Sequence, residues 1–238
     1  MSLVRMTWRD TLFAHWAVAP ETVASRLPPG LALDTYGGRA WLSVVGFRMD
    51  GIRPRGTPEA LGFSFPELNL RTYVTHEGSP GIYFFNLDAG DRLGVRAARR
   101  LFHLPYYDAS MRVTDRDDGV RFRSRRVHRD APPLVFDADY RPTDEPLADE
   151  QRARFLTERY RFFTAGVDAA AQGADPRTAA ESTRVGEIRH DPWPLVPAEL
   201  DVRRNDCFVA NGFETPDGDP VCHYAPALAV KADRVRRV

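Results

Sequence analysis

The chain has 238 residues, of which 43% are hydrophobic and 11% aromatic, and its 33 basic residues balance 33 acidic ones. This length and hydrophobic content predict a single folded domain over residues 1–238 and exclude wholesale disorder. The zero net charge argues against nucleic acid or an anionic membrane as partner, and no apolar run approaches the roughly 20 residues of a membrane-spanning helix.

The sequence begins without the apolar core of a secretory signal, which predicts a cytoplasmic protein. We therefore expect the two cysteines, Cys207 and Cys222, to be reduced and structural. Lys231 is the only lysine, so chemistry that needs a side-chain amine has one candidate.

The first part of the chain predicts mainly strands, because apolar residues alternate with polar ones or run continuously between Gly and Pro turns. In chain order we expect a strand or irregular entry over 3–16, a helix over 19–27, strands over 31–36 and 40–49 joined by a Gly37-Gly38 hairpin turn, and strands over 65–74 and 82–88.

The second part mixes helices with further strands. We expect a helix over 92–102 capped by Asp91, a hairpin over 109–127 turning at Asp118-Gly119, a strand over 132–140, a helix over 147–157, an exposed excursion over 166–183 and a final strand over 224–230. Residues 158–164 either continue the preceding helix or begin a strand. The pattern predicts an α+β fold that is mainly antiparallel β, with a few flanking helices.

Arg121, Arg123 and Arg125 share one face of the strand that closes the predicted hairpin. A phosphate-binding stripe would need interleaved aromatic side chains, and Phe122 points the opposite way. We therefore interpret the three arginines as a solvated face balanced by nearby acidic residues.

The strand over 65–74 carries the most informative pattern. One face has Leu68, Leu70, Thr72 and Val74, and the other has Glu67, Asn69, Arg71 and Tyr73. The polar row is either a wetted surface with an ordinary ion pair or the wall of a cavity, where Arg71 holds a small anion and Glu67 moves a proton. We expect the side chains of Glu67 and Arg71 to be close enough to pair.

Tyr106 and Tyr107 follow Pro105 at the end of a predicted helix. They either pack with their hydroxyls satisfied locally or donate a hydrogen bond to a ligand oxygen. The sequence has no P-loop, Gly-x-Gly-x-x-Gly, nucleophile elbow or His-Glu-x-x-His motif, and its six histidines are widely separated. We therefore predict neither a metal nor a cofactor.

Four segments in order resemble the YqjF-like family of uncharacterised bacterial proteins: Phe-Pro-Glu-Leu-Asn-Leu-Arg-Thr-Tyr-Val at 65–74, Leu-Pro-Tyr-Tyr-Asp-Ala-Ser-Met at 104–111, Phe-Leu-Thr-Glu-Arg-Tyr at 155–160 and His-Asp-Pro-Trp-Pro-Leu at 190–195. That family is thought to belong with the acetoacetate decarboxylase-like proteins. The resemblance implies a bent antiparallel β-barrel or cone around a cavity.

The decarboxylases carry an aromatic-x-Glu strand motif, which Phe65-Pro66-Glu67 resembles, and a Gly-Arg-Glu-x-x-Gly-x-Pro-Lys-Lys run, onto which residues 98–107 fall without a gap. Arg99 and Pro105 agree with that run, but Tyr106 and Tyr107 replace both lysines. The first lysine of the decarboxylases forms a Schiff base, which tyrosine cannot form. The resemblance therefore argues against acetoacetate decarboxylation by that route.

The first hypothesis is a small-molecule enzyme of the lyase, hydratase or isomerase type, acting on a small keto or carboxylate compound. Glu67 and Tyr106 are its predicted catalytic residues, and Asn69, Arg71, Tyr107 and Arg99 are its predicted substrate-binding residues. The second hypothesis is a non-catalytic barrel that binds a small ligand. A third is an assembly module whose aromatic strands form the interface of a homo-oligomer.

Overall fold

The computed structural model describes residues 2–92, 95, 102–165 and 183–238, and strands dominate these residues. The strands are β1 (Val4–Val18), β2 (Ala32–Leu33), β3 (Ala40–Pro54), β4 (Phe63–His76), β5 (Ser79–Ala89), β6 (Tyr106–Asp115), β7 (Val120–Arg126), β8 (Val135–Pro142), β9 (Arg161–Ala165), β10 (Thr183–Arg189), β11 (Val196–Asn205), β12 (Val221–Ala232) and β13 (Arg236–Arg237). Helices α1 (Pro20–Ala24) and α3 (Glu150–Thr157) and 3-10 turns at Glu59–Leu61 and Val209–Asn211 lie between the strands.

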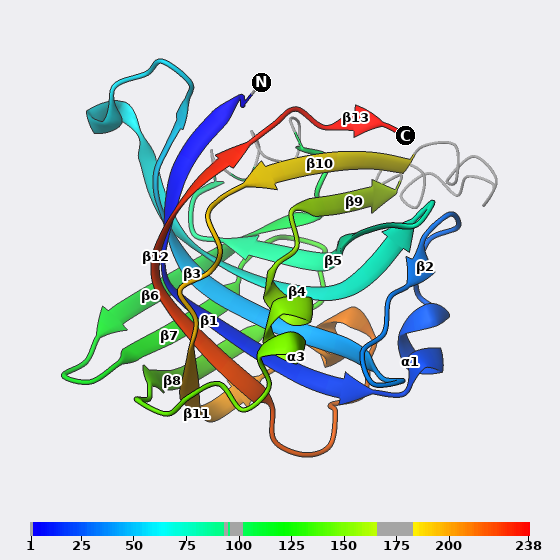
Figure 1. The fold of residues 1–238 in the computed structure, drawn as a ribbon. Coiled ribbons are helices and arrows are strands. Elements are labelled where there is room, and N and C mark those ends of the chain that lie inside the picture. The colour runs from blue at the N-terminus through cyan, green and yellow to red at the C-terminus, as the bar shows by residue number, and fades with distance from the viewer. Residues whose placement is uncertain (1, 93–94, 96–101, 166–182) are drawn as a thin grey trace.

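The strands close into two circuits that share one curved wall (Figure 1). The larger circuit is a barrel of nine strands, in the order β5-β6-β7-β8-β11-β12-β1-β3-β4, and the β4–β5 pairing closes it. The smaller circuit consists of β5, β9, β10, β12, β1, β3 and β4. Most pairings are antiparallel, but β5 pairs in parallel with both β6 and β9. The fold is therefore mainly antiparallel β, as predicted.

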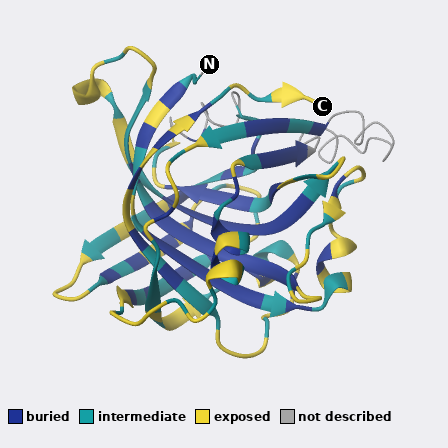
Figure 2. Ribbon diagram, in the orientation of Figure 1, coloured by how far each residue is buried: buried dark blue, intermediate teal, exposed yellow. Residues whose placement is uncertain are grey.

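Three of the shared strands, β1, β3 and β4, have middle stretches that are buried on both faces, which explains their long apolar runs (Figure 2). Alternate residues of β1 and β4, such as Leu12 and Leu68, pack into the nine-strand circuit against Phe122 of β7 and Phe136 of β8. The intervening residues, such as Phe13 of β1, face the seven-strand circuit. One sheet thus separates a filled core from a second compartment.

The chain near Gly37 and Gly38 differs from the predicted hairpin. Tyr36 and Arg39 form an isolated bridge around these two glycines, both of which have positive φ, so the tight turn is present. However, β2 pairs with β4 and not with β3. The prediction of two paired strands is wrong because β4 lies between β2 and β3 in the sheet.

Other predicted segments have mixed outcomes. The hairpin turning at Asp118-Gly119 is confirmed as β6 and β7, and residues 158–164 lead into the strand β9 rather than continuing α3. Most of the predicted helix over 92–102 and nearly all of the excursion over 166–183 lie outside the described residues. The strands β10, β11 and β13 were not predicted.

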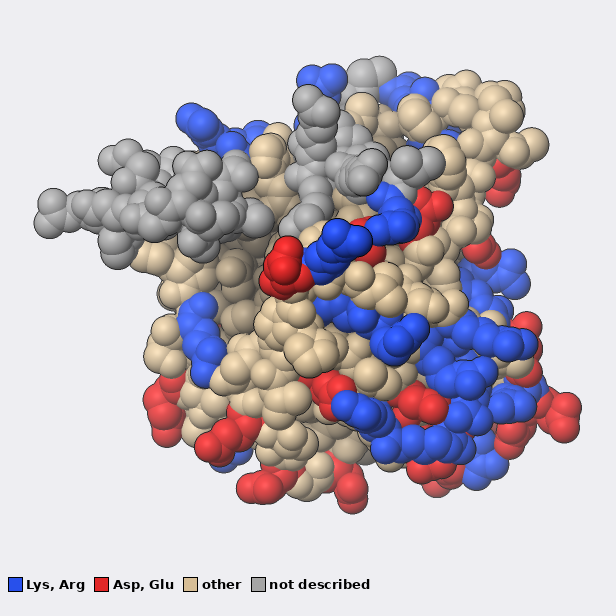
Figure 3. Space-filling model, turned by 180° about the vertical axis from the view of Figure 1, so that it is seen from behind, with Lys and Arg blue, Asp and Glu red and all other residues tan. Residues whose placement is uncertain are grey.

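The arginine row of β7 lies on the outer surface, as predicted. Arg121 pairs with Asp137 of β8 over 3.0 Å, and Arg123 and Arg125 are exposed. Figure 3 shows arginines gathered on the side of the molecule where β6–β8 lie, with acidic residues between them. The balancing carboxylate of Arg121 comes from the next strand.

Cys207 is buried and Cys222 half-buried, and both thiols are free. Lys231 is exposed on β12, where its neighbours Val230 and Ala232 are the buried residues. Within the described part of the chain, no helix is long and apolar enough to cross a membrane.

Candidate functional site

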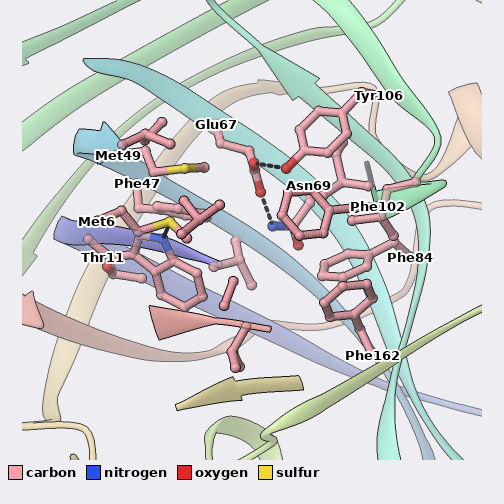
Figure 4. Close-up of a pocket in the computed structure, with 18 of the residues that line it drawn as sticks. Met6, Thr11, Phe47, Met49, Glu67, Asn69, Phe84, Phe102, Tyr106 and Phe162 are labelled. Carbon is pink, nitrogen blue, oxygen red and sulfur yellow. Dashed lines mark hydrogen bonds between the residues drawn. The ribbon is translucent and has the colours of Figure 1, made fainter. Parts of the chain in front are cut away.

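A cavity of about 420 Å³ lies inside the seven-strand circuit. Its volume falls within the range of small-molecule sites. In Figure 4, Met6, Phe47 and Met49 line one side and Phe84, Phe102 and Phe162 line the other. The polar side chains among its lining residues are few: Thr11, Arg53, Glu67, Asn69, Arg71, Tyr106 and Arg161, with the indole N–H groups of Trp8 and Trp193.

The strand β4 supplies the polar row predicted from its sequence. Glu67, Asn69 and Arg71 are 3%, 2% and 7% exposed, and all three line the cavity. Their backbones pair with Phe47, Val45 and Ser43 of β3, so the inward face of the sheet continues from one strand to the next. The row is therefore a cavity wall rather than a wetted surface.

The carboxyl group of Glu67 accepts two hydrogen bonds. Tyr106 Oη donates to Oε2 over 2.7 Å, and Asn69 Nδ2 donates to Oε1 over 3.2 Å (Figure 4). Burial raises the pKa of Glu67 from 4.5 to about 7, although both hydrogen bonds act to lower it. A carboxyl that titrates near neutral pH can both accept and release a proton at that pH.

Tyr106 begins β6, and the parallel pairing with Leu87 of β5 places it beside the cavity. Burial, followed by the charge of Glu67, raises the pKa of Tyr106 well above 10. Its hydroxyl therefore stays protonated at neutral pH and is available as a donor.

Tyr107 faces away from the cavity, because successive residues of a strand point to opposite sides. The guanidinium of Arg126 lies 4.1 Å from the centre of its ring, and His128 packs edge-on against it. Tyr107 therefore does not line this cavity beside Tyr106, as the prediction that it binds substrate there required. Arg99 lies outside the described residues.

Arg71 does not pair with Glu67, so that expectation is also wrong. The two residues are four positions apart on β4, which corresponds to about 13 Å of backbone. Arg71 Nη2 donates to the carbonyl oxygen of Leu156 over 3.0 Å, and Tyr73 Oη donates to the same oxygen over 2.7 Å. The guanidinium therefore leans along β4 away from Glu67.

A buried polar network behind Arg71 was missed by the sequence interpretation. Ser43 Oγ lies 2.7 Å from His15 Nδ1 and 2.8 Å from Tyr73 Oη. Burial, followed by the charges of His223, Arg71 and Arg152, lowers the pKa of His15 well below 6.5, so its imidazole is neutral. Polar residues at inward positions of otherwise apolar strands, His15 on β1 and Ser43 on β3, were the available signal.

Among the residues that the structure describes, no group of three or more His, Cys, Asp or Glu side chains is arranged to hold a metal ion. The polar side chains that β4 and the start of β6 place on the cavity wall are one carboxyl, one phenol, one amide and one guanidinium.

Comparison with known proteins gives relatives in sequence and in fold. The model of the DUF2071 family, described as an uncharacterized conserved protein, matches residues 5–229. The uncharacterized protein YqjF of Bacillus subtilis strain 168 is 41% identical over 226 residues, which cover 94% of this chain and 87% of YqjF.

Solved structures at low identity share the fold. MppR, an enduracididine biosynthesis enzyme complexed with pyruvate, has a TM-score of 0.62 at 12% identity, and the match covers 100% of this chain and 91% of the MppR chain. Acetoacetate decarboxylase from Legionella pneumophila has a TM-score of 0.62 at 13% identity, and the match covers 99% of this chain and 88% of the decarboxylase. Another acetoacetate decarboxylase has a TM-score of 0.65 at 11% identity, and the match covers 100% of this chain and 90% of that protein. The acetoacetate decarboxylase-like fold is thereby confirmed.

Proposed function

The chain belongs to the DUF2071 family, and we propose that it is a small-molecule enzyme that moves a proton on a keto or carboxylate compound bound in the cavity of the seven-strand circuit. The observation that carries this proposal is the Glu67 carboxyl. It is buried among apolar side chains, is held by Tyr106 and Asn69, and has a pKa of about 7. Such a group is matched to acid–base catalysis at neutral pH.

In the proposed reaction, the ionised Glu67 removes a proton from the carbon next to a carbonyl group. The Tyr106 hydroxyl turns from Glu67 to the carbonyl oxygen and donates a hydrogen bond to the enolate that forms. Asn69 holds the carboxyl in place through Nδ2. Returning the proton to the same or another carbon gives exchange or isomerisation, and loss of a leaving group from the enolate gives a lyase or hydratase reaction.

This route does not use a Schiff base. Lys231 is the only lysine in the sequence, and it is exposed on β12 rather than lining the cavity. The position that the family resemblance aligns with the Schiff-base lysine is Tyr106, which hydrogen-bonds Glu67 instead. The fold's relatives include MppR with bound pyruvate, so a carbonyl ligand is chemically consistent with a cavity of this architecture.

The proposal is tested by following solvent deuterium exchange into a panel of ketones and keto acids by proton NMR. The wild-type protein is expected to accelerate exchange next to the carbonyl of at least one compound. Glu67→Gln is expected to lower that rate by about 10²- to 10⁴-fold, because the base is removed while the amide keeps the shape. Equal rates in the two proteins would remove Glu67 from the mechanism.

A binding barrel without turnover is the second candidate, and the predominance of apolar side chains in the cavity wall favours it. A ligand that binds only the folded protein raises its thermal unfolding temperature. Stabilisation by compounds that undergo no exchange would favour this candidate over the enzyme.

A further inference from the structure

Among the described residues, one arginine of the cavity wall has no carboxylate that balances its charge. Of the three arginines that line the cavity, Arg53 pairs with Glu59 over 3.5 Å and Arg161 pairs with Glu187 over 3.7 Å. Arg71 is 7% exposed, and within the described part of the chain no carboxylate lies in ion-pair distance of it.

Arg71 also keeps an unused donor. Nη2 donates to the Leu156 carbonyl oxygen, whereas Nε is buried and has no hydrogen-bond partner among the described residues. A buried guanidinium that lacks both a counter-ion and a full set of acceptors is costly, and an anion placed against it removes that cost. Because Arg71 lines the cavity, a ligand in the cavity can reach it.

The surroundings of Arg71 hold a second unpaired donor and further positive charge. The Arg71 guanidinium lies 5.4 Å from the centre of the Phe13 ring, and Trp193 packs edge-on against that ring; Trp193 Nε1 is buried and has no partner within the described chain. Behind them, burial lowers the pKa values of His15 and His223, that of His223 to about 4, and the positive charge of Arg152 lowers both further. These imidazoles are therefore neutral and add no second cation that could bind an anion in place of Arg71.

This donor-rich region lies apart from the carboxyl of Glu67. The guanidinium leans toward Tyr73, because both side chains donate to Leu156, and Tyr73 lies two positions farther from Glu67 on β4. Four residues of strand span about 13 Å, so the two polar ends of the row are well separated. Val45, Phe47 and Phe84 line the cavity wall on the neighbouring strands.

We propose that the ligand of this cavity is an amphipathic carboxylic acid, whose carboxylate binds Arg71 and whose apolar body extends to Glu67 and Tyr106. A guanidinium edge matches the two oxygens of one carboxylate, and the apolar wall matches a hydrocarbon chain or ring. A short keto acid such as pyruvate, with its carboxylate next to its carbonyl, cannot occupy both ends. The position of the reacting carbon rests on the proposed function, whereas the carboxylate subsite does not.

The test measures binding of three probes by isothermal titration calorimetry at pH 8: octanoate, octanamide as its uncharged match, and pyruvate. We expect octanoate to bind the wild-type protein at least about tenfold more tightly than octanamide, since a charged hydrogen-bonded contact contributes that much. We expect pyruvate to bind more weakly than octanoate.

Variants then locate the carboxylate. Arg71→Gln keeps an amide that can donate to Leu156, and we expect it to abolish the preference for octanoate while octanamide still binds. Arg53→Gln removes the same charge from an arginine already paired with Glu59, and Glu67→Gln removes the carboxyl at the other end, so we expect both to keep the preference.

Equal affinity of the wild-type protein for octanoate and octanamide would overturn the subsite, and this comparison needs no variant to fold. A preference that persists in Arg71→Gln would also overturn it. Failure of the deuterium-exchange experiment with an intact preference for octanoate would remove the proposed catalysis and leave the carboxylate subsite standing.

Discussion

The Tyr106 hydroxyl donates to Oε2 of Glu67 over 2.7 Å, although the two residues are 39 positions apart in the chain. Two strand pairings bring them together, because Leu87 of β5 pairs with Asn69 of β4 on one side and with Tyr106 of β6 on the other. The short parallel pairing of β5 with β6 therefore completes the polar site.

Glu67→Gln is expected to change how stability depends on pH. Between pH 4.5 and about 7 the folded protein keeps the Glu67 proton and the unfolded chain loses it. The stability that this group contributes is thus complete below pH 4.5, is lost as the pH rises to about 7 and is constant above that. Residue 67 of the variant does not titrate. The difference in unfolding free energy between the variant and the wild type therefore shifts by about 3 kcal/mol in favour of the variant when the pH rises from 4.5 to 8. Urea unfolding at both pH values measures this, and an equal difference at the two would contradict it.

Tyr106→Phe is expected to raise the pKa of Glu67 above about 7, because the hydrogen bond from Tyr106 acts to lower that pKa. If Glu67 acts as the base, the rising limb of the pH–rate profile for deuterium exchange moves to higher pH. The matched control is Tyr107→Phe, since Tyr107 lies against Arg126 on the other side of the strand. Identical profiles for the two variants would argue against the contact.

Asp88→Asn is expected to destabilise the protein strongly. Asp88 and Arg126 form a bidentate ion pair at 2.7 and 2.8 Å, with side chains that are 0% and 2% exposed. Removing one partner of such a pair leaves a buried unpaired charge, which costs about 3–5 kcal/mol of unfolding free energy. The control is Glu199→Gln, which removes one of the two exposed carboxylate partners of Arg141 and is expected to cost less than about 1 kcal/mol. Chemical denaturation of both variants would contradict the account if the losses were similar.

Gly186→Ala is expected to shrink the cavity. The glycine pairs with Phe162 across β9 and β10, and an added Cβ would lie 2.0 Å from the Phe162 ring, which lines the cavity. The ring must move, at a cost of about 1–3 kcal/mol in stability, and octanamide should bind more weakly. Adding Phe162→Leu should recover part of both losses, because the two positions are coupled. Fully additive effects in the double variant would argue against this packing.

The residue pattern predicted the strands that have one clear alternation or a continuous apolar run. The face of β4 that bears Glu67, Asn69 and Arg71 follows directly from period two, and the family resemblance favoured its inward direction. The strand β11 was missed because Val196–Asn205 carries charged residues without a regular apolar face, as suits a strand that is largely exposed.

The partners of each side chain were not predictable in the same way. Tyr106 and Tyr107 look equivalent after Pro105, and only the start of β6 at Tyr106 sends one to the cavity and the other to Arg126. The network of His15, Ser43 and Tyr73 draws on three strands whose register is fixed by long-range pairing. The residues around each of these positions do not determine that register.

The most direct test of the account is the pKa of Glu67 itself. A carbon-13 NMR titration of protein labelled at the glutamate side-chain carboxyls follows each group separately. We predict one carboxyl that titrates near pH 7 and disappears from the spectrum of Glu67→Gln. If every glutamate carboxyl instead titrates between about pH 4 and 5, the range of ordinary glutamates, Glu67 is not the buried acid–base group on which the proposed function depends.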